Sequence, residues 1–170
     1  MSYYHQHYQN KILGVLMVGA GLLALAFAWF LEDIWYMSPC GMCLLERWPY
    51  RLMVVFGIIA YFSKSRWIIG LILILILASL GLSFVHIGVE QGWWLSPLPE
   101  CRMQMSTNQN IETQFANMPM RPSKPCDLPS YLFTWLPVSL TMMNGLYSLA
   151  LLVIVLILLS STRRTRKFYH

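Results

Sequence analysis

Residues 39–47 read Pro-Cys-Gly-Met-Cys-Leu-Leu-Glu-Arg and join two apolar segments of the chain. Cys40 and Cys43 have the C-x-x-C spacing, and Arg47 follows four residues after the second cysteine. A disulfide across so short a loop removes little entropy from the unfolded chain and therefore adds little stability. A C-x-x-C pair is more often a redox centre or half of a zinc knuckle than a structural crosslink.

The composition is that of an integral membrane protein. Of the 170 residues, 57% are hydrophobic and only 11% are charged, whereas soluble domains carry about 25% charged residues. The length leaves no room for a second sizeable domain, so we expect a single membrane domain. The net charge of +5 comes from basic residues at the ends of apolar segments, so nucleic-acid binding is not indicated.

The apolar segments predict four membrane-spanning helices, at about residues 12–31, 41–62, 67–87 and 138–159. The second span has to include the charged turn at Glu46 and Arg47, because the uncharged part from Leu52 onward is too short to cross alone. Pro49 predicts a kink there, or a fresh helix start just after the motif. The predicted fold class is therefore an all-α membrane protein, a four-transmembrane-helix bundle with loops at about 32–40 and 88–137.

The distribution of charge orients this bundle through the positive-inside rule. Lys11, Lys64, Arg66 and the basic tail fall on one side, and all seven acidic residues lie on the other side or at its surface. Both termini are therefore predicted to be cytoplasmic. The two loops on the opposite side then hold every cysteine of the chain: Cys40, Cys43, Cys101 and Cys126.

An even number of cysteines on the oxidising side of a membrane favours disulfides. Cys40–Cys43 with Cys101–Cys126 is the first pairing to consider, but the sequence does not decide the pairing. A Cys101–Cys126 bond could be structural and stabilise its loop by about 3 kcal/mol. Zinc binding by the four cysteines is another alternative, although the second pair lacks the spacing of a zinc knuckle.

Taken together, these motifs resemble the disulfide bond formation protein B (DsbB) family of membrane thiol:quinone oxidoreductases. The resemblance covers essentially the whole chain and rests on Pro39-Cys40-Gly41-Met42-Cys43, on Glu46-Arg47, on His86 at the end of the third span and on Pro125-Cys126-Asp127. Vitamin K epoxide reductases also combine a four-helix bundle with C-x-x-C. The order of motifs disfavours them, because here the C-x-x-C opens the second span and the loop pair comes later.

The resemblance implies an enzyme of the bacterial inner membrane that reoxidises a periplasmic DsbA-like thioredoxin-fold oxidase. Electrons would pass through two catalytic cysteine pairs to a membrane quinone, either ubiquinone or menaquinone. Carried over from the family, Cys101 is attacked by the partner, Cys40 exchanges with the loop pair, and Cys43 faces the quinone. No metal site is implied. The alternative function is a non-catalytic four-helix membrane protein with structural disulfides or a zinc site.

Arg47 and His86 are the predicted quinone-binding residues. In a helix, Arg47 lies one turn from Cys43 on the same face, where a guanidinium would stabilise a thiolate. A charged side chain within a membrane segment usually marks function. The alternatives are that Arg47 extends toward the membrane surface or pairs with Glu46. His86 could donate a hydrogen bond or a proton to the quinone, or it could be an interfacial packing residue.

Overall fold

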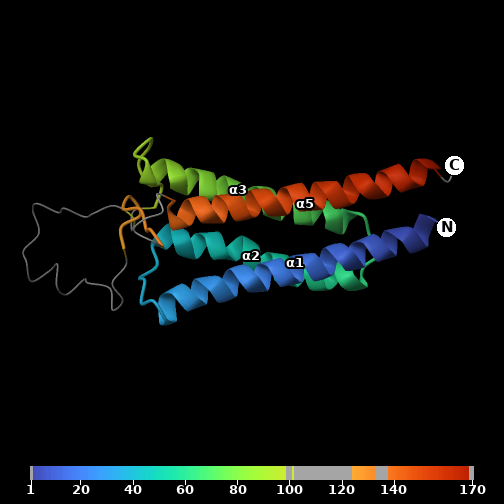
Figure 1. The fold of residues 1–170 in the computed structure, drawn as a ribbon, viewed down its shortest axis with the longest axis horizontal. Coiled ribbons are helices and arrows are strands. Elements are labelled where there is room, and N and C mark those ends of the chain that lie inside the picture. The colour runs from blue at the N-terminus through green and yellow to red at the C-terminus, as the bar shows by residue number, and fades with distance from the viewer. Residues whose placement is uncertain (1, 99–100, 102–123, 133–137, 169–170) are drawn as a thin grey trace, which may run out of the picture.

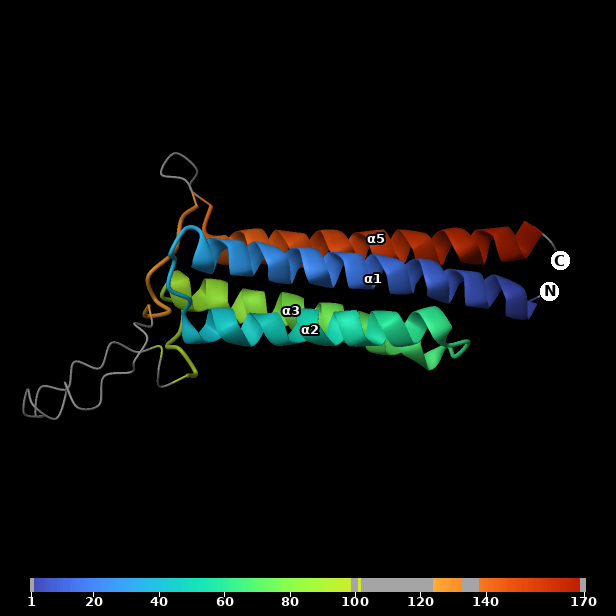
Figure 2. The ribbon, with the colours of Figure 1, turned by 90° about the horizontal axis from the view of Figure 1, so that it is seen from below.

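The computed structural model describes residues 2–98, 101, 124–132 and 138–168. They form four helices, α1 (Ser2–Asp33), α2 (Gly41–Phe62), α3 (Trp67–Glu90) and α5 (Leu140–Phe168). The helices run side by side along one long axis (Figure 1; Figure 2). Within the described residues, β structure is limited to isolated bridges. The predicted all-α class is thus confirmed.

Three of the helices are long and apolar enough to cross a membrane, over His7–Asp33, Trp67–Glu90 and Leu140–Ser161. The helix α2 is not among them, because Glu46, Arg47 and Arg51 all fall within its length. The chain therefore has the helices of a membrane protein. The crossing by α2, which would make four spans, stays a prediction.

Three helices extend beyond the expected spans. The helix α1 begins at Ser2 rather than near residue 12, α3 continues to Glu90, and α5 runs on to Phe168. Neither residues 2–11 nor residues 160–168 contain Pro or Gly, so nothing in these polar ends interrupts a helix that has already formed.

The second helix has the bounds 41–62 that were expected of the second span. Pro49 lies inside it, so the alternative of a fresh helix start after the motif is wrong. The reason lies at the N-terminal end of α2. There Cys40 is the N-cap, and its Sγ accepts a hydrogen bond from the Cys43 backbone N–H at 3.0 Å. This cap starts the helix at the C-x-x-C motif, before the chain reaches the proline.

The core of the bundle depends on a close approach of α1 and α2. A Cβ atom at Gly14 would lie 2.6 Å from the carbonyl oxygen of Gly57, and one at Gly57 would lie 2.9 Å from that of Gly14. Only glycine leaves room for this contact, as at small-residue helix interfaces in membranes. Around it lie fully buried apolar side chains, among them Leu13, Met17, Met53, Ile72, Ile76 and Val155.

The two ends of the bundle differ in what they hold. The N-terminal end of α1 and the C-terminal end of α5 lie together at one end, and the start of α2 and residues 124–132 lie at the other (Figure 1). The helix α1 packs mainly along α2, and α5 along α3, whereas α1 and α5 make only a few contacts with each other. One of these few contacts is the hydrogen bond from Tyr147 Oη to the Ala20 carbonyl oxygen, at 2.8 Å.

Candidate active site

The C-x-x-C pair forms a disulfide at the start of α2, with the Cα atoms of Cys40 and Cys43 5.0 Å apart. Cys40 is buried, and Cys43 is partly exposed. The backbone N–H of Cys43 points at the Cys40 sulfur. Because a helix N-terminus carries partial positive charge, a Cys40 thiolate formed on reduction would be stabilised here.

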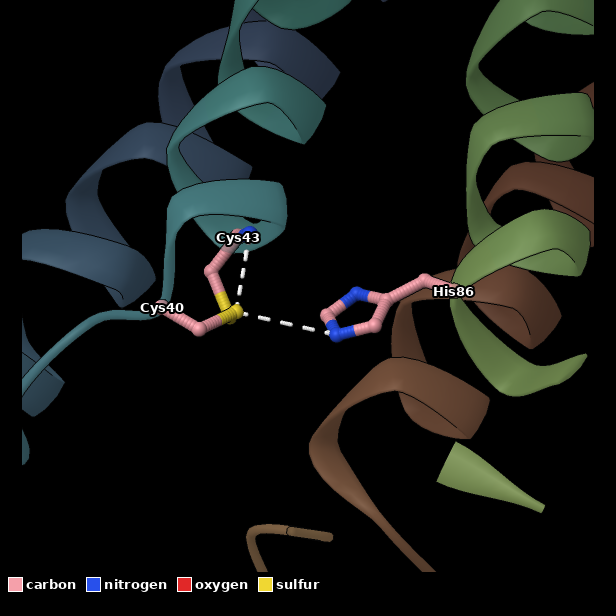
Figure 3. A group of neighbouring side chains, drawn as sticks. All are labelled: Cys40, Cys43 and His86. Atoms are coloured by element: carbon pink, nitrogen blue, oxygen red, sulfur yellow. Dashed lines mark hydrogen bonds between the residues drawn. A yellow bond between two sulfur atoms is a disulfide. The ribbon is translucent and has the colours of Figure 1, made fainter. Parts of the chain in front are cut away.

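His86 on α3 reaches across the bundle to this pair (Figure 3). Its Nε2 lies 3.6 Å from the Cys40 sulfur, and its Nδ1 lies 3.1 Å from a carboxylate oxygen of Glu46. The exposed fractions of the His86 and Glu46 side chains are 2% and 10%. The histidine is therefore held between a redox sulfur and a carboxylate.

Glu46 is anchored in turn by Asn144 on α5. The Nδ2 of Asn144 donates to Glu46 Oε2 at 2.9 Å and to Ser83 Oγ at 2.8 Å. Tyr50 donates to Asn144 Oδ1 at 2.5 Å, and its oxygen is also 3.0 Å from Ser148 Oγ. Side chains from α2, α3 and α5 thus form one buried polar network that starts at Cys40.

The second disulfide, Cys101–Cys126, lies against the first. Cys101 and Cys126 are 2% and 1% exposed and share a buried cluster with Cys40, Met42 and Val89. An isolated parallel bridge also joins the backbone of Cys40 to that of Lys124, two residues before Cys126. Cysteines far apart in the sequence are therefore packed together at one end of the bundle.

A cleft of about 360 Å³ opens beside the two disulfides. Its walls come from all four helices and include Cys43, Arg47, His86, Cys126 and Tyr147. Apolar residues of α1 and α5 form much of the rest, so the cleft lies between two helices that make few contacts with each other. An apolar cleft with a few polar groups is the usual form of a binding site for a small organic molecule.

A family comparison agrees with this geometry. The family model "Disulfide bond formation protein DsbB" matches residues 10–158. The chain belongs to the DsbB family. It is therefore a membrane oxidoreductase of disulfide bond formation, and the resemblance inferred from its motifs is confirmed.

The chain is 29% identical over 147 residues to the "Uncharacterized protein RP370" of Rickettsia prowazekii (strain Madrid E), and the match covers 84% of each chain. No solved structure matches the chain.

Arg47, the other residue expected at the DsbB-type quinone site, lines the cleft but does not pair with Glu46. Its guanidinium binds the carboxylate of Glu32 on α1 through two hydrogen bonds, with Nη1 and Oε2 3.0 Å apart. The alternative pairing with Glu46 is wrong because His86 and Asn144 already occupy both oxygens of that carboxylate.

Among the described residues, the Cys40, Cys43 and His86 ligand atoms lie within 4.8 Å of one another and could in principle hold a metal ion. Both cysteine pairs are disulfides in this structure. Disulfide sulfurs are not thiolates, which are the form of cysteine that binds zinc. The zinc alternative therefore gains no support from this state, and the arrangement is suited to thiol–disulfide exchange.

Three residues of this DsbB-family site were not expected from the sequence. The sequence indicates Glu46 only as part of the Glu46-Arg47 motif and as a possible partner of Arg47, and it assigns no role to Glu32 or Asn144. Asn144 is an amide within the apolar helix α5, and Glu46 is a carboxylate within α2. Polar groups at this depth are costly without partners, so their positions were a signal that could have found them.

Proposed function

We propose that this chain reoxidises a periplasmic DsbA-like thioredoxin-fold oxidase and delivers the electrons to a membrane quinone. The observation that carries the proposal is the packing of two disulfides in one buried cluster beside an apolar cleft. One pair would receive electrons from the partner, and the other would deliver them into the cleft. Thiol–disulfide exchange requires an attacking thiolate to reach a disulfide sulfur, and this packing brings the two pairs within reach.

The proposed relay uses all four cysteines. A partner thiolate attacks Cys101, and the second partner thiol then resolves the mixed disulfide, leaving Cys101 and Cys126 reduced. The Cys126 thiolate attacks the Cys40 sulfur, so that a Cys126–Cys40 bond forms and Cys43 leaves as a thiolate. Cys101 then attacks Cys126, restoring the loop disulfide and releasing Cys40. The relay thus moves two electrons from the partner to the Cys40–Cys43 pair.

The cleft fits a quinone ring in its size and lining. Cys43 and Arg47 of α2 would lie against the ring from one side, and His86 of α3 from another. A bound quinone, ubiquinone or menaquinone, supplies a two-electron and two-proton acceptor. The Arg47 guanidinium stabilises a Cys43 thiolate by its charge, and Glu32 sets the direction in which that guanidinium points.

The orientation follows from the ends of the bundle. Helix ends rich in Arg and Lys lie together opposite the disulfides. We propose that these ends, with both termini, are cytoplasmic, and that α2 completes four crossings of the inner membrane. Both disulfides would then face the periplasm, where disulfides persist.

The burial of Cys101 and Cys126 also favours a second function, in which their disulfide is purely structural. In the proposed relay, this pair has to leave the buried cluster to meet the partner. In the structural alternative, it never does. The two functions therefore differ in whether the loop cysteines are needed for turnover.

The test is quinone reduction by the purified chain in detergent, with a reduced thioredoxin-fold oxidase as electron donor and a short-chain quinone as acceptor. We expect turnover by the wild type and none without the oxidase. Each of the four cysteine-to-serine variants should lose at least about 100-fold in rate, because the relay uses every sulfur. Wild-type rates in both Cys101→Ser and Cys126→Ser would show that the loop disulfide is structural.

A further inference from the structure

We infer that Glu46 and His86 form an acid–base pair for the sulfur of Cys40. In this pair His86 exchanges the proton with the sulfur, and Glu46 is a positioning residue that acts through His86. The inference rests on the proposed function and gives the buried carboxylate of α2 a role in it. It also assigns His86 to the exchange between cysteine pairs, in addition to any contact with a quinone.

The order of contacts fixes how the imidazole is protonated. Glu46 Oε1 lies 3.1 Å from Nδ1 of His86, and an ionised carboxylate can only accept a hydrogen bond. Nδ1 therefore carries the ring hydrogen. In the neutral ring, Nε2 then presents a lone pair to the Cys40 sulfur, 3.6 Å away. The ring is thus oriented to take a proton from a Cys40 thiol or to return one to the thiolate.

The anchoring of Glu46 shows that this orientation is built into the bundle. Its second oxygen accepts a hydrogen bond from Asn144, whose amide nitrogen also donates to Ser83. The Asn144 oxygen accepts from Tyr50, so every polar atom of that amide has a partner. A buried carboxylate is costly unless its oxygens are bound and a positive charge can form beside it. Here the group placed to become positive is His86.

This Glu46–His86 dyad would act in the step of the relay in which Cys40 leaves the Cys126–Cys40 disulfide as a thiolate. Cys101 attacks the Cys126 sulfur, the Cys101–Cys126 bond forms, the Cys126–Cys40 bond breaks, and the electron pair stays on Cys40. The loop thiols give up their two protons when they attack as thiolates, and His86 takes one of them to become an imidazolium. This imidazolium stabilises the Cys40 thiolate, and the Glu46 carboxylate stabilises the imidazolium. When Cys40–Cys43 closes again, a quinone in the cleft would accept the two electrons and two protons, and His86 would release the proton that it holds.

Other ionisable groups line the cleft around the dyad, and each helix supplies at least one. They are Glu32 of α1, Arg47 and Tyr50 of α2, Glu90 of α3, Tyr147 of α5, and Lys124 from the segment before Cys126. Arg47 and Glu32 are bound to each other, and Glu90 accepts hydrogen bonds from Ser139 and Thr141. Among the described residues, Glu46 is the carboxylate that is hydrogen-bonded to His86.

The test measures the reactivity of Cys40 itself. The reduced protein in detergent is alkylated with iodoacetamide over a range of pH, and mass spectrometry follows the peptide that contains Cys40. Glu46→Gln keeps the size of the side chain and an oxygen for Asn144, but it removes the charge. We expect the profile to move to higher pH, with alkylation at neutral pH slower by about tenfold, the effect of one pH unit.

A second variant, His86→Gln, tests the pair if Glu46→Gln folds poorly, and a third variant, Asp33→Asn, is the control for the change of charge. His86→Gln removes the proton acceptor and should give a similar loss. Asp33→Asn makes the same change of charge at an exposed carboxylate at the same end of the bundle, and it should leave the profile unchanged. A wild-type Cys40 profile in both folded dyad variants would overturn the inference, as would an equal shift in Asp33→Asn.

This measurement is independent of the proposed function. Alkylation of Cys40 requires neither a quinone nor a partner oxidase, so a wild type that fails to reduce quinone could still show the predicted shift. Conversely, normal quinone turnover with an unshifted Glu46→Gln profile would leave the proposed function standing and remove only the role of the dyad.

Discussion

Glu32 on α1 binds Arg47 on α2 through a two-point contact between carboxylate and guanidinium, at the wall of the cleft that Cys43 also lines. The two side chains are 26% and 17% exposed, so the pair is largely shielded from solvent. The contact joins the first two helices and directs the one arginine that was expected to meet the quinone. It leads to two predictions about the cleft.

Replacing Arg47 with Ala should slow quinone reduction far more than it lowers stability, because in the proposed mechanism the guanidinium stabilises charge at the reacting sulfur. We expect a loss of about 100-fold in kcat/KM for quinone, a typical cost for removing one charge-stabilising donor. Arg47→Lys should recover part of it, since the charge survives while the planar fork is lost. Arg51→Ala is the control, because Arg51 is exposed and stacks on Trp48. Unchanged quinone kinetics in Arg47→Ala would refute the role.

Glu32→Gln should weaken quinone turnover through Arg47 and not by itself. We expect a loss of about fivefold, equivalent to a coupling near 1 kcal/mol. The double variant Glu32→Gln, Arg47→Ala should then be no slower than Arg47→Ala alone. Additive losses would show that Glu32 contacts the quinone or supports the fold independently of the arginine.

The site illustrates what the sequence could and could not predict. Cys40, Cys43, Cys101, Cys126, Arg47 and His86 were all expected to be important, and the structure places them around one cleft and its neighbouring cluster. Their mutual contacts depend on how helices distant in sequence pack. Glu32 and Arg47 lie on different helices, as do Glu46, His86 and Asn144, so no local spacing relates them. The partner of a buried charge is a tertiary property.

The fold, like the site, was predictable from the sequence only in part. Hydropathy located the helices, and the bounds of α2 were predicted as they are found. It did not locate the outer ends of α1 and α5, because hydropathy reports a membrane-spanning segment and not the helix that contains it. Pro49 allowed a helix start after the motif, because the local rule for proline does not take into account the cap that Cys40 provides nine residues earlier.

The close contact of α1 and α2 can be tested with one methyl group. Gly14→Ala places a Cβ atom 2.6 Å from the Gly57 carbonyl oxygen, so the two helices have to separate. We expect a loss of about 1–3 kcal/mol in stability, as for other overpacked cores. Gly19→Ala on the same helix meets nothing within 4 Å and should be neutral or slightly stabilising. Thermal unfolding in detergent compares the two, and equal melting temperatures would contradict the packing.

The orientation in the membrane can be tested with reporter fusions. Alkaline phosphatase fused after Ser65 should be inactive, because the positive charges of Lys64 and Arg66 favour a cytoplasmic location for that turn. The same reporter fused after Gln91, just beyond α3, should be active. A cytoplasmic fluorescent reporter should give the opposite pattern. The same reporter activity at both positions would contradict the four-span topology.

The central claim is that electrons pass directly between the two cysteine pairs, and trapping the bond between them tests it most directly. The variant Cys43→Ser, Cys101→Ser keeps only Cys40 and Cys126, which both line the cleft. After mild oxidation, peptide mapping under non-reducing conditions should find an intramolecular Cys40–Cys126 disulfide. The converse variant, Cys43→Ser, Cys126→Ser, should form much less of the Cys40–Cys101 bond. Recovery of Cys40 and Cys126 as free, fully alkylated thiols would contradict the relay.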